Sequence, residues 1–123
     1  ALFANHNTID HLIAFVDHNR QQLDGYTDDI MSLGDVAAKF TAFGWHAQEI
    51  DGHDVDAIAE AIANAKAATG KVSVIVLNTC KGIGCTFAEG IVNNHHMTFT
   101  KEQSTQAVEA AQKELQRLEE TQV

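Results

Sequence analysis

The 123-residue sequence predicts an α/β fold, in which a three-layer αβα arrangement is built around a parallel sheet. Two observations support this prediction. Short apolar runs alternate with segments whose apolar residues recur every three or four positions, in the order strand, helix, strand, helix, strand, helix. Residues 72–77 are almost wholly apolar and β-branched, which is typical of a strand in a parallel sheet. This alternation implies right-handed crossovers between the strands.

The first half of the chain gives four elements and a loop. Residues 1–7 look like the last turns of a helix, and residues 11–16 form the first strand, an apolar run suited to burial on both faces. Residues 19–32 are expected to be a long polar loop. A helix is predicted over residues 35–43, before a glycine stop, and residues 45–50 form the second strand.

The second half gives two longer helices around the third strand. Asp54 is expected to cap a helix that Gly70 ends, with an apolar stripe made by Val55, Ile58, Ile62 and Ala65. A Thr-Lys-Glu-Gln capping box at residue 100 begins the last helix, whose predicted buried face contains Val108, Ala111, Leu115 and Leu118. Three strands form a narrow sheet, so we expect the open flank of the first strand to need a cover.

The length and charge of the chain restrict its class. We predict a single domain over residues 1–123. Seventeen acidic residues against 8 Lys and Arg give a net charge of −9, which disfavours nucleic acid and membrane surfaces as partners. The sequence has neither a long apolar run nor a signal peptide pattern, so we expect a cytoplasmic protein. Cys80 and Cys85 lack the second pair that a structural zinc site needs, which favours reduced thiols.

Asn19 follows the first strand, at the edge of a parallel sheet where α/β proteins bind their ligands. Its carboxamide oxygen is a hard, neutral ligand that suits Mg²⁺ or Ca²⁺. Asparagine at such a position also forms Asx turns that only shape a loop. The residue pattern leaves both interpretations open.

Two later loops hold further candidate residues. Residues 81–84 read Lys-Gly-Ile-Gly, in which glycines allow close backbone approach to a phosphate and the lysine supplies charge. A flexible turn with a solvated lysine explains the same pattern. His95 and His96 could be ligands, acid–base groups or phosphate donors, or simply polar surface.

Several sequence words, taken in order, resemble one family. Residues 17–25 read Asp-His-Asn-Arg-Gln-Gln-Leu-Asp-Gly, residues 39–46 read Lys-Phe-Thr-Ala-Phe-Gly-Trp-His, and residues 50–54 read Ile-Asp-Gly-His-Asp. Together they resemble the thiamine diphosphate-binding domain of transketolases, most closely the short bacterial form that is split into N-terminal and C-terminal subunits. The resemblance extends from Ile9 to Gln116 and implies a partial thiamine diphosphate-binding domain.

The resemblance implies a site for thiamine diphosphate and a divalent metal, Mg²⁺ or alternatively Ca²⁺. Asn19 matches the asparagine that binds the metal in this family. Gln21 matches the residue whose backbone carbonyl completes the protein ligation, and Leu23 falls where the family places an apolar residue against the cofactor.

The resemblance also implies roles for the later loops. Lys81 and Gly82 match a lysine-glycine word beside the cofactor. His95 matches a histidine near the diphosphate and the substrate, which makes it the candidate catalytic residue. The neighbours of that histidine differ from the family pattern, because Asn94 and His96 flank it here.

One family word is absent from this sequence. No Gly-Asp-Gly precedes Asn19, and in the family that word supplies a carboxylate to the metal. The resemblance further implies that the glutamate which activates the cofactor comes from another domain, on the partner subunit. Because Mg²⁺ usually takes at least one anionic ligand besides phosphate, we expect this chain to bind metal weakly and to be inactive alone.

The resemblance therefore implies part of a transketolase-like enzyme, which transfers a two-carbon ketol unit between sugar phosphates. Its expected partners are the sugar-phosphate substrates and either further copies of the chain or a pyrimidine-binding, C-terminal transketolase subunit. The alternative is a non-catalytic binding or assembly module derived from a transketolase. The absent Gly-Asp-Gly word favours the alternative, whereas Asn19 and the diphosphate-side loops favour the enzyme.

Overall fold

The computed structural model describes residues 1–121, which form two compact units. Unit 1 consists of Ala1–Arg20 and Thr27–Thr79, and unit 2 consists of Gln21–Tyr26 and the chain from Cys80 onward. The single domain over residues 1–123 stays a prediction, and its last two residues lie outside the described part. Within residues 1–121, no helix has the length and apolar character needed to cross a membrane.

Three parallel strands form the sheet of unit 1, in the order β1-β5-β4. They are β1 (Ile13–His18), β4 (His46–Asp51) and β5 (Ser73–Asn78). Each lies one or two residues further along the chain than the apolar run that predicted it, because backbone pairing continues into the polar residues that follow. Register pairs Val16 and Glu49 with Val76, so the three strands end at the same edge.

Strand order decides which strand is buried. The central strand β5 is buried on both faces, and Val74, Ile75 and Val76 have no exposed surface. The expectation that the first strand is also buried on both faces is wrong, since β1 lies at the edge of the sheet and Phe15 is 49% exposed. Its flank is open, as the narrow sheet predicted.

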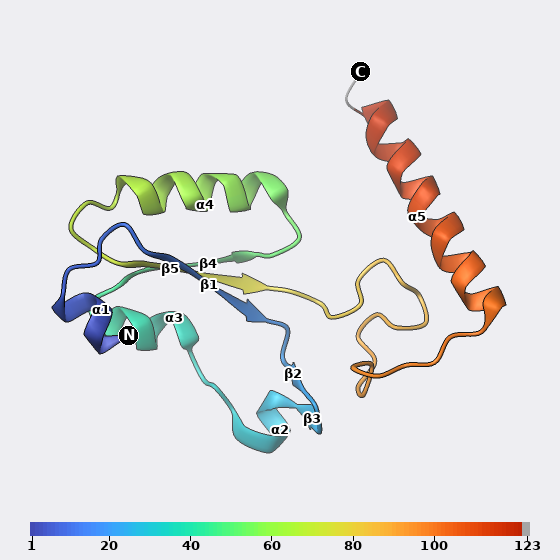
Figure 1. Ribbon diagram of the computed structural model, residues 1–123, viewed down its shortest axis with the longest axis horizontal. Coiled ribbons are helices and arrows are strands. Elements are labelled where there is room, and N and C mark those ends of the chain that lie inside the picture. The colour runs from blue at the N-terminus through green and yellow to red at the C-terminus, as the bar shows by residue number, and fades with distance from the viewer. Residues whose placement is uncertain (122–123) are drawn as a thin grey trace. The chain divides into compact units, whose positions relative to one another are not determined.

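Helices cover both faces of this sheet, which confirms the three-layer αβα arrangement (Figure 1). On one face α4 (Val55–Ala67) packs Ala61 and Ala65 against Ile75. On the other face lie α1 (Leu2–His6) and α3 (Val36–Ala42), where Ala4 and the buried Trp45 join the core.

Helix caps in unit 1 follow the local sequence. Asp35 accepts a hydrogen bond from the Ala38 backbone N–H at 2.7 Å, which begins α3. Asp54 accepts from the N–H groups of Asp56 and Ala57, both at 3.0 Å, and begins α4 as predicted. These carboxylates satisfy N–H groups that have no partner inside their helices.

Residues 19–32 are more ordered than the polar loop predicted for them. Gln21–Gln22 (β2) and Gly25–Tyr26 (β3) pair as a short antiparallel hairpin in unit 2, and Thr27–Met31 forms the helix α2 in unit 1. The prediction missed the hairpin because each of its strands has only two residues, too few for an alternating pattern.

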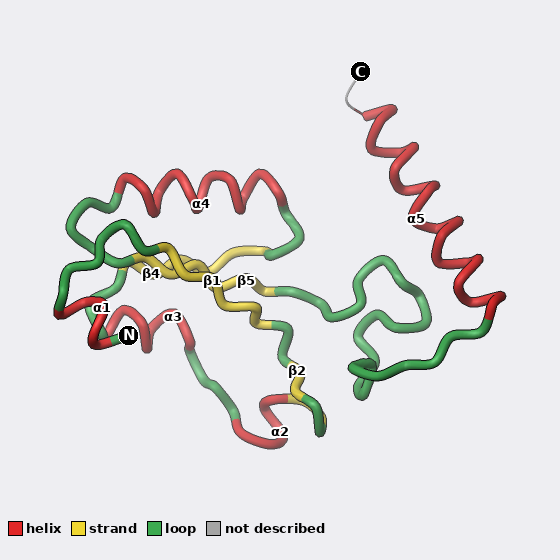
Figure 2. The backbone as a smooth tube through the Cα atoms, in the orientation of Figure 1, coloured by secondary structure: helices red, strands yellow, loops and turns green. Residues whose placement is uncertain are grey.

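Unit 2 contains a long loop and one long helix. Residues 80–100 contain neither helix nor strand, and α5 (Lys101–Thr121) follows (Figure 2). Thr100 and Gln103 exchange hydrogen bonds of 3.0 and 3.2 Å, which confirms the capping box. The predicted buried face is wrong within unit 2, since Val108 and Leu115 are each 56% exposed. Among the described residues of unit 2, no other helix or strand is as long as this 21-residue helix.

An ion pair on α5 gives a pH prediction. Arg117 donates to the Glu114 carboxylate at 2.5 and 2.8 Å, and these hydrogen bonds, then the charge of Arg117, lower the pKa of Glu114. Because the pKa of Glu114 is lower in the folded helix than in the unfolded chain, the ion pair stabilises the helix at pH values above the unfolded pKa. This contribution is lost as the pH falls through the folded pKa. Arg117→Ala should return the pKa of Glu114 to its ordinary range, as NMR titration of the carboxyl carbon would measure. An unchanged pKa would contradict the pairing.

Candidate functional site

The carboxyl ends of the three parallel strands meet at one edge of unit 1, and this edge is polar. Asn19 follows β1, Gly52 follows β4 and Thr79 follows β5. Parallel α/β sheets bind ligands at this edge, because there the chain leaves the core and presents polar groups. Asn19 therefore lies at the edge where such ligands bind, and its role as a metal ligand stays a prediction.

Asp17, in β1, contacts residues from two strand ends. Its Oδ2 accepts a hydrogen bond from Asn19 Nδ2 at 3.1 Å, and its Oδ1 accepts a short one from Thr79 Oγ1. The ladder between the strands continues here, because the backbone N–H of Thr79 donates to the carbonyl of His18 at 3.5 Å. One carboxylate therefore joins Asn19 to the end of the central strand.

Gly52 brings the end of β4 against the end of β5, where Thr79 lies. Its N–H donates to the carbonyl of Asn78 at 2.8 Å. A Cβ added at Gly52 would lie 2.9 Å from Leu77 Cβ, and closer still to the methyl group of Thr79. The Asp51-Gly52-His53-Asp54 word is thus explained by a turn, a close approach and a helix cap, and of these the sequence predicted the cap.

Two buried polar atoms at this edge have no hydrogen-bond partner in the described chain. They are His18 Nδ1 and Asn78 Oδ1, on residues paired in register between β1 and β5. Asn78 uses its other polar atom, Nδ2, to donate to Glu49 Oε1 at 2.9 Å. Buried polar atoms are nearly always bonded in folded proteins, so their gathering here is typical of an edge that receives a ligand or water.

Gln21 and Leu23 lie in the hairpin of unit 2. Gln21 pairs with Tyr26, and Leu23 is at the turn with 62% of its surface exposed. Asn19 belongs to unit 1, so joint ligation of one metal by Asn19 and Gln21 stays a prediction. Within the described residues, no three His, Cys, Asp or Glu side chains gather in a group that could hold a metal ion.

Lys81 and Gly82 open a compact turn in unit 2. Gly82 has φ +79°, and the carbonyl of Lys81 accepts hydrogen bonds from the Gly90 backbone N–H at 3.0 Å and from Asn94 Nδ2 at 3.4 Å. Asn94 also donates to the carbonyl of Ala88 at 2.7 Å. The structure thus brings the lysine-glycine turn and the segment before His95 together.

The His95 side chain is exposed at the end of this arrangement. Its ring lies edge-to-face against His96, with 4.6 Å between the ring centroids. The predicted phosphate and substrate contacts of Lys81 and His95 stay predictions. Cys80 and Cys85 in the same unit are both half-buried, and no disulfide joins them.

Gly82→Ala should destabilise unit 2. A left-handed backbone costs a residue with a Cβ about 1–2 kcal/mol, and here the Cβ would also lie 2.6 Å from the carbonyl oxygen of Ala88. Gly84→Ala is a matched control, because Gly84 has φ +81° but no atom within 4 Å of an added Cβ. Urea denaturation should give a larger loss for Gly82→Ala, and equal losses would rule out the close contact.

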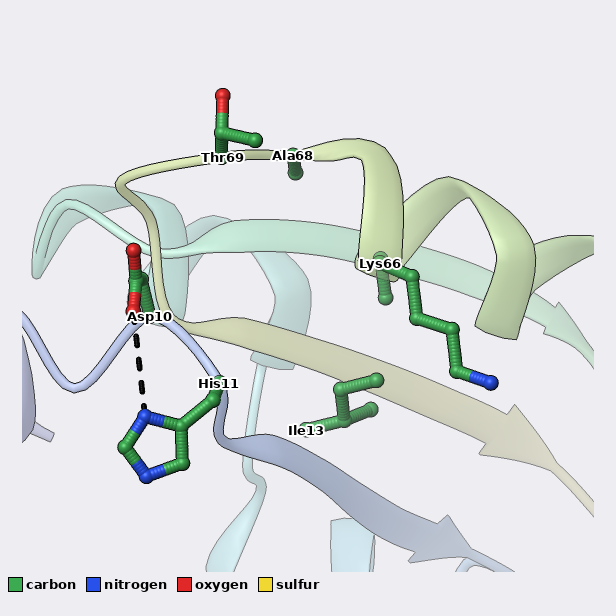
Figure 3. Close-up of a pocket in the computed structure, with 7 residues that line it drawn as sticks. Asp10, His11, Ile13, Lys66, Ala68 and Thr69 are labelled. Atoms are coloured by element: carbon green, nitrogen blue, oxygen red, sulfur yellow. Dashed lines mark ion pairs between the residues drawn. The ribbon is translucent and has the colours of Figure 1, made fainter.

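A pocket of about 340 Å³ lies at the opposite, amino-terminal edge of the sheet in unit 1. Figure 3 draws its lining, with Asp10 and His11 on one side and Lys66 on the other. His11 Nδ1 lies 3.9 Å from Asp10 Oδ1, and the His11 side chain is 86% exposed. No feature of the predicted site lies at this pocket, and the Asp10–His11 pair is a solvated one.

Sequence reasoning missed three residues that shape the site: Asp17, Thr79 and Asn94. Asp17 and Thr79 are 62 residues apart, and only the pairing of β1 with β5 brings them together. Asn94 replaces a neighbour of the family histidine, and its contact with Lys81 depends on the path of a loop without regular structure. For Asp17, the Asp-x-Asn spacing at the strand end was the available signal.

A parallel sheet with a polar carboxyl edge places unit 1 in the class of α/β domains that bind ligands at that edge. Comparison with known proteins makes the assignment more specific. Residues 1–116 match the family described as "Transketolase, thiamine diphosphate binding domain". The chain therefore belongs to the transketolase family.

Curated relatives and solved structures agree with this assignment. The chain is 49% identical over 114 residues to the 6-deoxy-6-sulfo-D-fructose transketolase subunit SqwG of Clostridium sp. (strain MSTE9), and the match covers 93% of this chain and 42% of that protein. It is 33% identical to an apulose-4-phosphate transketolase subunit of Phocaeicola vulgatus, over 97% of this chain and 42% of that protein. The chain thus spans less than half of the length of these relatives.

The fold is also similar to that of a solved transketolase. The crystal structure of the Campylobacter jejuni enzyme matches 89% of this chain and 17% of that chain, with a TM-score of 0.80 and 26% sequence identity. The arrangement of elements described above therefore matches part of a transketolase thiamine diphosphate-binding domain.

Proposed function

We propose that this chain supplies the metal and diphosphate side of the thiamine diphosphate site in a transketolase assembled from more than one polypeptide segment. The observation that carries the proposal is the position of Asn19. It lies at the carboxyl edge of a parallel sheet, in a chain that matches the family over residues 1–116, with its amide nitrogen held by Asp17.

The donor set fits part of a site for a divalent metal that is also bound by a diphosphate. The Asn19 side-chain oxygen and the Gln21 carbonyl are neutral oxygen ligands of the kind that Mg²⁺ and Ca²⁺ accept, and a carboxylate from another segment would complete the site. Lys81 adds a positive charge beside the Gly82 turn, and Leu23 offers an exposed apolar surface. When bound, thiamine diphosphate would supply the electron-accepting ring for ketol transfer.

The roles of the chain in the reaction are those of binding and orientation. Asn19 and Gln21 would hold the metal, Lys81 and Gly82 would face the diphosphate, and His95 would donate a proton or hydrogen bond on the substrate side. We further propose that the chain is inactive alone, since no group of three ligating side chains gathers in its described part and the sequence has no Gly-Asp-Gly word.

The proposed partner is a second transketolase polypeptide, because the two curated relatives described above are named as subunits. Their names mention a ketose with a sulfonate and a ketose with a phosphate. A ketose with an anionic end group is therefore the proposed substrate class. The net charge of −9 leaves recognition of that anion to local cations such as Lys81.

A hybrid protein tests this function. In it, the chain replaces the matching 114-residue segment of the Clostridium relative, and thiamine diphosphate is titrated with and without Mg²⁺ by calorimetry. We expect metal-dependent micromolar binding by the hybrid and little binding by the chain alone. A hybrid that folds, as judged by circular dichroism, and does not bind would overturn the proposal. A hybrid that binds cofactor and partner but transfers no ketol unit would favour the non-catalytic assembly module.

A further inference from the structure

We propose that Asp17 is a positioning residue that aims the carboxamide oxygen of Asn19 at the metal, a role that rests on the proposed function. Asp17 Oδ2 accepts from Asn19 Nδ2 at 3.1 Å. The nitrogen and oxygen of a carboxamide point in divergent directions, so this bond turns the oxygen away from Asp17. The oxygen is the only atom of the carboxamide that can ligate a cation.

The carboxylate is itself held from the neighbouring strand. Asp17 is paired in register with Leu77, and Thr79 lies two residues further on, so both side chains project from the same face of the sheet. Thr79 Oγ1 donates to Asp17 Oδ1. The two carboxylate oxygens of Asp17 thus have separate partners. Thr79 holds Asp17 in place, and Asp17 holds Asn19 in place.

Thr79 is in turn held by the third strand end. The backbone of Gly52 lies so close to the Thr79 methyl group that an added Cβ would overlap with it. Its N–H is bonded to Asn78 at 2.8 Å. The order of contacts Gly52, Thr79, Asp17, Asn19 therefore links the ends of β4, β5 and β1, and the sheet determines the orientation of the ligand.

This arrangement also explains why residue 19 is an asparagine although Mg²⁺ prefers anionic ligands. An aspartate there would place a second carboxylate oxygen against Asp17 Oδ2, at the distance now taken by a hydrogen bond. Partners that orient a metal ligand typically change metal affinity about tenfold to a hundredfold when they are removed.

The test measures the orientation of the amide in the full chain and the metal role in the hybrid protein. ¹⁵N relaxation of the Asn19 side-chain amide reports its order without any ligand. We expect an ordered amide in the wild type and in Asp17→Asn, where Oδ1 of the new side chain still accepts from Asn19 and its Nδ2 donates to Thr79. We expect a mobile amide in Asp17→Leu. Asp10→Asn, at the opposite edge of the sheet, is the control for loss of a charge.

The second measurement is made in the hybrid protein, with Mn²⁺ in place of Mg²⁺ and with thiamine diphosphate, and follows paramagnetic broadening of the same amide. We expect Asp17→Leu to need about 10 to 100 times more Mn²⁺ for equal broadening. If the wild type is not broadened, the metal role of Asn19, and with it the proposed function, is wrong. If Asp17→Leu keeps an ordered amide or is broadened at the same Mn²⁺ concentration as the wild type, the positioning role alone is overturned. Thr79→Val replaces Asp17→Leu if the latter does not fold, and should partly mobilise the amide.

Discussion

Replacing Ile75 by alanine is expected to lower the free energy of unfolding of unit 1 by about 2–5 kcal/mol. Ile75 lies in the central strand and has no exposed surface, between Ala61 and Ala65 of α4 and the partly buried apolar residues around them. The removed side-chain carbons would leave a cavity, because the backbone of a paired central strand cannot collapse into it. Domains are stable by only about 5–15 kcal/mol, so this one change removes a large share.

Urea denaturation followed by circular dichroism measures this loss. Ile30→Ala is the matched control, since the same side chain is removed from a residue that is 46% exposed in α2. We expect the control to cost less than half as much. Similar losses for the two variants would mean that β5 is not the centre of the packed core.

Replacing Asn19 by alanine is expected to weaken metal-dependent binding of thiamine diphosphate at least tenfold, with little change in stability. The substitution removes the proposed ligand oxygen and the donor to Asp17. Removal of a partner that only orients a metal ligand typically lowers metal affinity about tenfold to a hundredfold, and the loss of the ligand itself should not be smaller. The side chain lies at the edge of the sheet and contributes little to its core.

Calorimetric titration of the hybrid protein, with and without Mg²⁺, checks this prediction. Asn64→Ala, on the exposed surface of α4, is the control asparagine. Binding should change only in the presence of metal if Asn19 acts through the metal. An unchanged affinity of Asn19→Ala would remove the metal assignment while leaving the family assignment intact.

Local signals in the sequence predicted most of the elements. The β-branched run became the central strand, and Asp54 and Thr100 cap helices as their positions indicated. Such features depend on neighbouring residues only, through backbone preference and side-chain hydrogen bonds. Asn19 could be placed at the carboxyl edge for the same reason, because it directly follows an apolar strand.

Features that depend on distant residues could not be predicted in this way. The order β1-β5-β4 exposes Phe15 and brings Thr79 to Asp17, and no local pattern contains that order. The prediction that the apolar stripe of α5 is buried failed for a related reason. A periodic stripe predicts that a helix has a face to bury, but not which element covers it.

The strand order also affects how the protein folds. Asp17 and Thr79 are 62 residues apart in the chain, and all three strands of the sheet are paired in parallel. The contact between these two residues therefore cannot form within a local hairpin. Such long-range pairing is slow, because loop-closure entropy is lost before the contacts form. The orientation of Asn19 should therefore be acquired late in folding, together with the sheet itself. Ligands bound at this edge would therefore slow the unfolding of the sheet more than they accelerate its folding.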